Sequence, residues 1–183
     1  NSFTLALALA AAIEERVQIV NLSLSGPPDP LLNSLVQAGA RRGILYVGAA
    51  PSETGFDGFP RGAPAVIPVD VAEPGHAQRG VLLAPGTEIV TLTPGGSYDF
   101  VSGSSLATAH VTGTIALLLA IAPQLDRAAV YALLSSSQHG TTTALDAPSI
   151  NACNAIVTLR KQGVCVGLKA GSSTRPTAIG AQH

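Results

Sequence analysis

The sequence predicts an α/β fold with parallel strands, and two observations support this. The apolar residues are mainly Ala, Val, Leu and Ile, accompanied by 19 glycines, a composition typical of alternating strands and helices. A β-branched run at Val17–Leu24, a helical pattern at Leu31–Arg42 and an apolar run at Ile44–Gly48 follow one another. Such a strand–helix–strand unit implies parallel pairing. With 183 residues, the chain is long enough for one domain with a sizeable core.

The N-terminal part alternates helices with these strands. A helical pattern covers Phe3–Arg16, before the first strand. The proline-rich segment Ser25–Pro30 breaks the chain, and Gly43 ends the second helix. We therefore expect two helices in this part.

Short strands and turns fill the middle of the chain. The candidate strands are Ala65–Val71, Val81–Ala84, Ile89–Leu92 and Tyr98–Val101. Pro68 lies inside the first of them, and proline cannot donate a ladder hydrogen bond. We therefore expect that strand to be an edge strand or to contain a bulge.

The C-terminal part is predicted to be helical. Leu106–Ala122 reads as a buried core helix rather than a membrane span, because it is slightly short and is interrupted by polar residues. A further helix runs from the cap Asp126 to about Ser135, and the last covers Asn151–Lys161. We expect one domain over residues 1–169 and a polar tail at 170–183.

Composition argues against one class of partner. The formal net charge is −1 and charged residues make up 11% of the chain, which argues against nucleic acid as a partner. The sequence contains no methionine, so Asn1 is not a translation start, and we expect a processed product or a fragment. Leu5–Ile13 is apolar but has no basic segment before it, unlike a signal peptide.

Cys153 and Cys165 are the two cysteines of the chain. They can form a disulfide, which would indicate an oxidising compartment and hence a secreted or periplasmic protein. The alternative is two buried free thiols.

The segment that connects Tyr98–Val101 to the apolar helix is a candidate site. The turn Ser102–Ser105 leads from a strand directly into a helix, a geometry that can expose one hydroxyl at the helix N-terminus. Backbone N–H groups and the helix dipole gather there and favour negative charge. The alternative is a serine that only caps a core helix.

Three separated blocks resemble one protein family. They are VNLSLSG at Val20–Gly26, the turns Ala84–Gly86 and Pro94–Gly96, and SGSSLATAHVTG at Ser102–Gly113. These blocks resemble the subtilases, the subtilisin-like serine peptidases. The resemblance implies a three-layer αβα fold with a mainly parallel sheet that here lacks the N-terminal strands, so that residues 1–169 are part of a catalytic domain.

The last block resembles the family pattern S-G-T-S-M-A-x-P-H-V-x-G, which implies that Ser105 is the nucleophile. Ser104, Leu106 and Ala109 depart from this pattern, standing where threonine, methionine and proline are usual. The resemblance makes the nucleophile interpretation of Ser105 stronger than the cap interpretation.

The resemblance also implies a substrate site. Ser23, Leu24 and Ser25 would form the edge that pairs with an extended peptide and lines the specificity pocket, with Ser25 in place of a usual glycine. The segment that includes Ala49 and Ala50 would contribute to substrate binding.

The oxyanion position departs from the family. The segment GAAPSE resembles the family's A-A-G-N-E, which puts Ser52 at the oxyanion Asn position and Pro51 at the preceding glycine. A hydroxyl is shorter than an amide, and proline has no N–H, so we expect weak oxyanion binding here.

The family's aspartate motif D-[ST]-G and histidine motif H-G-T-H-V-A-G do not occur in this sequence. His110 does not replace them, because five helical positions place it about 140° around the helix from Ser105. The remaining candidates are expected to be surface histidines or carboxylates at strand ends and turns: His76, His139, Asp70 and Asp99.

No cluster of His, Cys, Asp and Glu has metal-ligand spacing, so we expect no cofactor. Calcium is possible by family resemblance, although no site for it is identified.

Two functions follow. The first is a portion of a subtilisin-like serine endopeptidase, inactive by itself, whose upstream segment or second chain supplies the missing residues. The second is a pseudo-peptidase that binds extended peptide or protein segments without cleaving them. An α/β-hydrolase with Gly103-x-Ser105 as its nucleophile turn is disfavoured, because Ala107 stands where that motif needs glycine.

Overall fold

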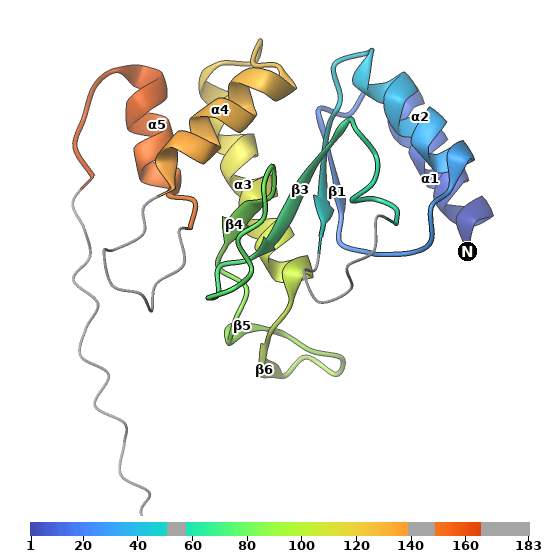
Figure 1. Cartoon of the computed structure of the whole chain (residues 1–183), viewed down its shortest axis with the longest axis horizontal. Helices are drawn as coiled ribbons and strands as arrows, with labels where there is room; N and C mark the ends of the chain where they lie inside the picture. Colours follow the sequence, from blue (N-terminus) through green and yellow to red (C-terminus); the bar gives the residue numbers. More distant parts are fainter. Residues whose placement is uncertain (51–57, 139–148, 166–183) are drawn as a thin grey trace, which may run out of the picture.

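The computed structural model describes residues 1–50, 58–138 and 149–165, which form a parallel sheet between two layers of helices (Figure 1). The four-stranded sheet consists, in spatial order, of β1 (Ile19–Leu22), β2 (Leu45–Ala49), β3 (Val66–Val71) and β4 (Leu82–Ala84). Each neighbouring pair is parallel. The predicted three-layer αβα fold is therefore confirmed.

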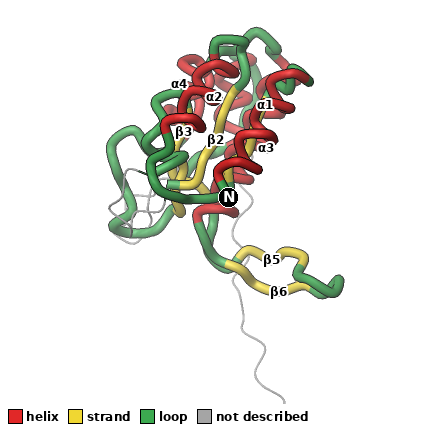
Figure 2. Tube along the Cα trace, turned by 90° about the vertical axis from the view of Figure 1, so that its right-hand side faces the viewer, coloured by secondary structure: helices red, strands yellow, loops and turns green. Residues whose placement is uncertain are grey.

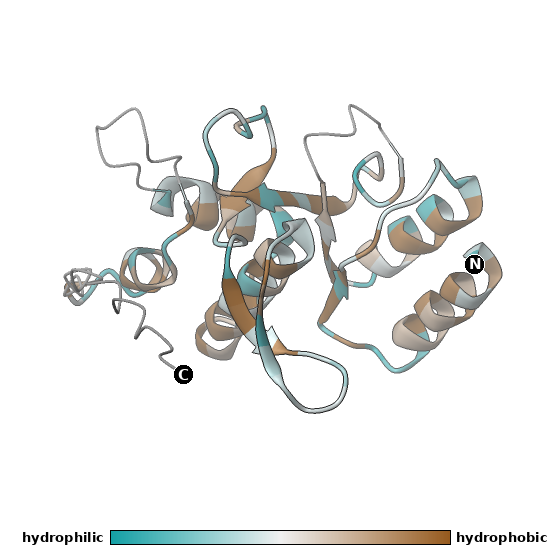
Figure 3. Ribbon diagram, turned by 90° about the horizontal axis from the view of Figure 1, so that it is seen from below, coloured by the Kyte–Doolittle hydropathy of each residue, from teal (hydrophilic) through white to brown (hydrophobic). Residues whose placement is uncertain are grey.

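One helical layer consists of α1 (Ser2–Glu14) and α2 (Pro30–Ala40). The other consists of α3 (Ser104–Ile121), α4 (Arg127–Ser137) and α5 (Ala152–Arg160). Alternate strand residues point to opposite layers, as the two-residue period of a strand requires. Tyr46 and Val66 belong to the core under α1 and α2, whereas Val47 and Ile67 belong to the core under α3. Figure 3 shows hydrophobic residues along the strands and on parts of each helix.

Helix α3 is the central helix of its layer. It is long and apolar enough to cross a membrane by length and composition alone. However, it packs against all four strands of the sheet, and Val111, Ile115 and Leu118 are fully buried. These contacts identify it as a core helix, and it begins two residues earlier than the sequence pattern predicts.

Side-chain caps begin the other four helices. The capping residues are Asn1, Asp29, Asp126 and Asn151. Hydrogen bonds from the Leu32 N–H, the Ser2 side chain and the Leu31 N–H lower the pKa of Asp29 below its usual value. Short polar residues at these positions satisfy N–H groups that have no partner within the helix.

The prediction that Pro68 marks an edge strand or a bulge is wrong. β3 lies between β2 and β4 and pairs regularly with both. The Ala50 N–H donates to the Val69 carbonyl, so Val69 faces β2 and Pro68 faces the opposite side. Pairing with β4 starts only at Val69. The Pro68 nitrogen therefore faces β4 at a position before the hydrogen bonds between β3 and β4 begin. An inner strand tolerates proline there, because no ladder hydrogen bond is lost.

Strands β5 (Ile89–Leu92) and β6 (Tyr98–Val101) form a separate antiparallel hairpin. Figure 2 shows this hairpin projecting from the body of the molecule. It leads the chain into α3 and thereby places the start of that helix.

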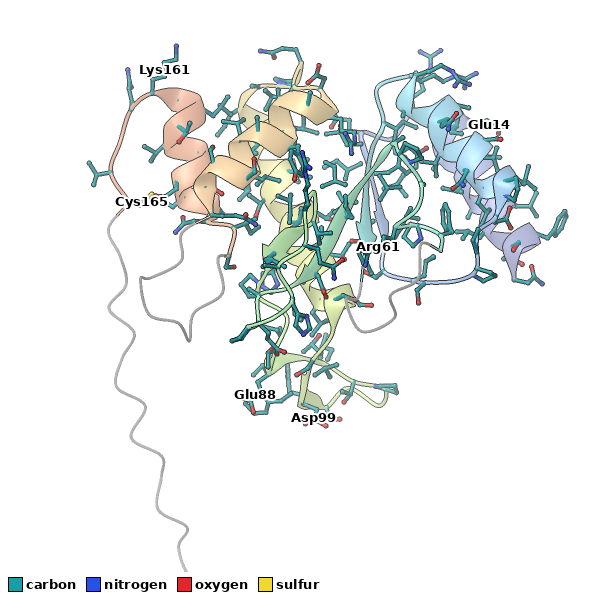
Figure 4. All side chains as sticks on the ribbon, viewed as in Figure 1. Glu14, Arg61, Glu88, Asp99, Lys161 and Cys165 are labelled. Carbon is teal, nitrogen blue, oxygen red and sulfur yellow. A yellow bond between two sulfur atoms is a disulfide. The ribbon has the colours of Figure 1, made fainter. Side chains whose placement is uncertain are left out.

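Cys153 and Cys165 are joined by a disulfide with a Cα–Cα distance of 5.8 Å. Cys153 lies in the first turn of α5, and Cys165 lies beside that helix (Figure 4). The bond attaches the chain after α5 to the helix itself.

Tyr46 fills the space between β2 and α2. Its side chain is fully buried, and its hydroxyl has no hydrogen-bond partner among the described residues. A Cβ at Gly39 of α2 would lie 1.9 Å from this hydroxyl oxygen, so only glycine fits there. Burial raises the pKa of Tyr46.

We predict that Tyr46→Phe raises the free energy of unfolding by about 1 kcal/mol, because it removes a buried hydroxyl without a partner. Urea unfolding at pH 7 measures this. The raised pKa also means that the unfolded chain ionises first, so stability falls as pH rises above about 10, the usual tyrosine pKa. The Phe variant lacks this contribution. A lower free energy of unfolding in Tyr46→Phe at pH 7 would show that the Tyr46 hydroxyl has a stabilising partner.

The companion variant Gly39→Ala should lose about 1–3 kcal/mol through overpacking. Tyr46→Phe should restore part of this loss, because it removes the hydroxyl, the nearest clashing atom. The new Cβ would then lie 2.9 Å from the ring carbon Cζ. Gly113→Ala is the control, since its Cβ would meet no atom within 4 Å.

Candidate functional site

The start of α3 is shaped by Gly103. This residue has φ 153° and ψ 160°, a conformation that favours glycine. Its N–H donates to the Gly86 carbonyl at 2.8 Å, and its own carbonyl accepts from the Leu106 N–H at 3.0 Å. The chain therefore turns sharply from β6 into the helix while remaining bonded to the turn after β4.

Gly86 allows the two turns to approach each other. A Cβ at Gly86 would lie 2.5 Å from Val71 Cγ1 and 3.0 Å from the Gly103 carbonyl oxygen. Any larger residue would push the start of α3 away from the sheet. The Pro85-Gly86 turn is thus part of the site.

The three serines of the turn have different environments. Ser102 Oγ accepts from the Glu88 N–H at 2.9 Å, on the hairpin side where Figure 4 labels Glu88. Ser104 is half-buried, and its carbonyl accepts from Thr108 Oγ1 at 2.7 Å. Ser105 is exposed, one residue inside the helix. Ser102 is also exposed but precedes the helix, so Ser105 is the exposed serine within the first turn of α3.

The interpretation of a serine as the cap of this helix is wrong. The N-cap is Gly103, and no side chain of the described residues bonds the first-turn N–H groups as a cap. This start differs from those of the other four helices. The uncapped N–H groups and the helix dipole favour an anion beside Ser105.

The segment after β1 lies against this turn, although the two are far apart in sequence. Ser23 Oγ donates to the Ser105 carbonyl oxygen at 3.0 Å across a separation of 82 residues. Ser23 and Ser25 are exposed, and Leu24 is half-buried. Leu24 and Ser25 line a pocket of about 340 Å³ together with Phe59 and residues of α1 and α2. The structure thus brings the predicted peptide edge next to the predicted nucleophile.

The other predicted site residues lie at the end of β2. Ala49 and Ala50 are 3% and 0% exposed, so their side chains are buried. The Ala50 N–H donates to the Val69 carbonyl at 2.8 Å. Pro51 and Ser52 lie outside the described residues.

The histidines have clear partners. His110 Nδ1 lies 3.1 Å from the Leu106 carbonyl of its own helix. His76 is not the ordinary surface histidine that the sequence suggested. Its Nδ1 lies 3.2 Å from Asp70 Oδ2 and its Nε2 lies 3.7 Å from Glu73 Oε2, with the Asp70 side chain 2% exposed. His139 lies outside the described residues.

Asp70, His76 and Glu73 form a cluster at the end of β3 and in the loop after it. Thr87 Oγ1 donates to Glu73 Oε1, so the cluster is connected to the turn that contains Gly86. Asp99 is exposed in β6, and its Oδ1 accepts from the Phe100 N–H at 2.8 Å. Within residues 1–50, 58–138 and 149–165, no three His, Cys, Asp or Glu side chains could together hold a metal ion.

Two further polar residues were not singled out from the sequence. Thr112 Oγ1 donates to Asn21 Oδ1 at 2.9 Å, and Asn21 Nδ2 donates to Ser23 Oγ at 2.8 Å. The spacing of Thr112, seven residues after Ser105, places both on one side of α3 and could have indicated this contact.

We predict that Gly103→Ala lowers the free energy of unfolding by about 1–3 kcal/mol, because a Cβ is strained in this backbone conformation. Urea unfolding tests this. Gly26→Ala is the matched control, since it has an ordinary φ and no atom within 4 Å of the new Cβ. Equal stability of Gly103→Ala and the wild type would show that the turn adopts another conformation.

Comparison with known proteins gives consistent matches. The model of the subtilase family matches residues 27–163. The chain is 36% identical over 126 residues to an intracellular serine protease of Paenibacillus polymyxa, covering 61% of this chain and 39% of that protein. It is 31% identical over 140 residues to a subtilisin of Bacillus pumilus, covering 69% and 51%. The chain thus spans about two fifths to a half of these relatives.

Solved structures show the same fold. The self-cleaved protease domain of PatA is 28% identical with a TM-score of 0.70, covering 87% of this chain and 68% of that one. Fervidolysin from Fervidobacterium pennivorans, a keratinolytic enzyme related to subtilisin, shares the fold at 22% identity and a TM-score of 0.70, covering 82% and 28%.

Proposed function

The chain belongs to the subtilase family, and we propose that it is a portion of a subtilisin-like serine endopeptidase with Ser105 as its nucleophile. The observation that supports this is the exposed residue Ser105 at the start of α3, where the described residues provide no side-chain cap. Negative charge that develops on a substrate carbonyl beside Ser105 would face the first-turn N–H groups and the positive end of the helix dipole.

The proposed reaction is acyl transfer followed by hydrolysis. The Ser105 oxygen attacks the peptide carbonyl carbon and gives its proton to a histidine base. The C–N bond then breaks, the amine leaves with that proton, and the acyl group remains as an ester on Ser105. Water cleaves the ester, which releases the acid and restores the hydroxyl. This chemistry uses no cofactor.

The base and its aspartate would come from outside these 183 residues, because the sequence contains neither family motif. An open groove of about 580 Å³ runs along α3 from Leu106, the residue after Ser105, past Gly113 to Leu117, with Ile89 of β5 on its other wall. Leu117 is 52% exposed there. An upstream segment or a second chain seated on this groove could bring a histidine to Ser105.

The substrate would be an extended peptide or protein segment. Ser23, Leu24 and Ser25 continue β1 beyond the sheet, and a peptide can add to such an edge through main-chain hydrogen bonds. The pocket of about 340 Å³ at Leu24 and Ser25 could take one of its side chains. The end of β2 at Ala49 and Ala50 would lie behind the bound peptide.

The alternative is a pseudo-peptidase that binds such segments without cleaving them. The observation that favours it is the sequence Pro51-Ser52 at the oxyanion position. The proline removes one backbone donor, and the serine hydroxyl reaches less far than an amide.

We predict that a fluorophosphonate labels Ser105 only when the chain is combined with its upstream segment, since the lone serine has no base to take its proton. Mass spectrometry of intact protein and peptides measures the label. Ser105→Ala should abolish labelling, and Ser104→Ala should retain it. His76→Gln should also retain it, because His76 is held by Asp70 and Glu73.

The outcomes separate the hypotheses. Labelling of the lone chain that is lost in His76→Gln would mean that the base is internal. Absence of labelling in both states, with peptide binding retained, would refute the endopeptidase and support the pseudo-peptidase.

The disulfide supports a secreted or periplasmic location, because disulfides persist in oxidising compartments. One similar protein is named an intracellular serine protease, so the disulfide rather than the family supports this proposal.

We predict that the natively produced protein, denatured without reductant, shows no free thiol and that reduction exposes both Cys153 and Cys165. Thiol titration measures this. Cys153→Ser should leave one free thiol and lower the free energy of unfolding by up to about 3 kcal/mol through lost loop closure. Two titratable thiols before reduction would contradict the oxidising location.

A further inference from the structure

A chain of hydrogen bonds connects α3 to β1 and ends at the Ser105 backbone. Thr112 Oγ1 donates to Asn21 Oδ1 at 2.9 Å, and Asn21 Nδ2 donates to Ser23 Oγ at 2.8 Å. Ser23 Oγ then donates to the Ser105 carbonyl oxygen at 3.0 Å. We propose that Thr112 is a positioning residue that holds the Ser105 peptide through Asn21 and Ser23. This inference rests on the proposed role of Ser105 as nucleophile.

The donors and acceptors fix the direction of this chain. The single proton of Ser23 points at the Ser105 carbonyl, so Ser23 Oγ must accept from its other neighbour. Only the NH₂ group of Asn21 can supply that donor, which leaves Asn21 Oδ1 facing Thr112. Thr112 shares its proton between Asn21 Oδ1 at 2.9 Å and the Thr108 carbonyl at 2.8 Å. The bonds at Ser23 and at Thr112 therefore require the same orientation of the Asn21 amide.

These hydrogen bonds restrain both the Ser105 peptide and the predicted peptide-binding edge at Ser23. A donor on the Ser105 carbonyl restrains rotation of the peptide plane that carries the nucleophile. The same bond holds Ser23 and thus the edge on which the peptide would lie. Misplacement of reacting groups by about 1 Å can reduce a rate 100-fold, so the relative position of these halves matters for the reaction.

Other threonines of α3 do not make this connection. Thr108 Oγ1 donates to the Ser104 carbonyl and Thr114 Oγ1 to the His110 carbonyl, both within the helix. Thr112 occupies a position that the family pattern leaves open, the x of H-V-x-G. The connection is thus a feature of this chain rather than of the motif.

The test compares Thr112→Val with Thr114→Val in the chain combined with its upstream segment. Each variant replaces the threonine hydroxyl with a methyl group of similar size, but only Thr112→Val breaks the connection to β1. The maximal rate of Ser105 modification by a fluorophosphonate at saturation should fall about fivefold in Thr112→Val, with half-saturation unchanged, as expected for one lost hydrogen bond. Thr114→Val and Thr112→Ser should retain the wild-type rate.

A double-mutant cycle with Ser23→Ala adds a second criterion. Thr112→Val should have little further effect in the Ser23→Ala background, because the connection is already broken at its last link. Equal rates in Thr112→Val and the wild type, or equal losses in Thr112→Val and Thr114→Val, would overturn the proposal.

A measurement that needs no reactivity separates this inference from the proposed function. The ¹³C shift of the Ser105 carbonyl reports its hydrogen bonds and should change in Thr112→Val but not in Thr114→Val. If the wild type is not labelled at all, the proposed function has failed, and the carbonyl shift alone then decides whether Thr112 holds the Ser105 peptide. An unchanged shift in Thr112→Val would refute that role.

Discussion

The hydrogen bond from Ser23 Oγ to the Ser105 carbonyl is the contact on which the site depends. It joins the carboxyl end of a strand to the start of a helix 82 residues later in the chain. The bond can form because α3 packs along all four strands, with Val111, Ile115 and Leu118 fully buried. Burial of that apolar face fixes the axis of the helix, and the polar residues at its start then determine what lies beside β1.

Two glycines make the close approach possible. Gly86 leaves room for the Gly103 carbonyl, and Gly103 adopts a backbone conformation that other residues rarely adopt. The same turn leaves the first-turn N–H groups of α3 without a side-chain cap among the described residues, unlike those of the other helices. Ordinary side-chain capping is therefore absent at the start of α3 among the described residues, and such local departures are typical of functional positions.

Local patterns predicted the elements well and two tertiary environments poorly. The ends of β5 and β6 agree with the sequence, and the helices differ by one or two residues, because apolar periodicity and breaking residues are local signals. The prediction for Pro68 was wrong because the cost of its missing N–H depends on which neighbouring strand its nitrogen faces, and on whether that strand is paired there. His76 was misjudged because its partner Asp70 is buried by strand packing that the residues around His76 do not reveal.

The sequence by itself determined the family, the layered α/β fold and Ser105 as the candidate nucleophile, because these follow from contiguous motifs and from the order of strands and helices. The tertiary structure decided that Ser105 is exposed within the first turn of α3, that Gly103 occupies the N-cap position, and that Ser23 contacts the Ser105 carbonyl. It also revealed Asn21 and Thr112, whose hydrogen bonds join segments about ninety residues apart. Such contacts depend on how α3 lies across the sheet, a property of the packed core that no single segment encodes.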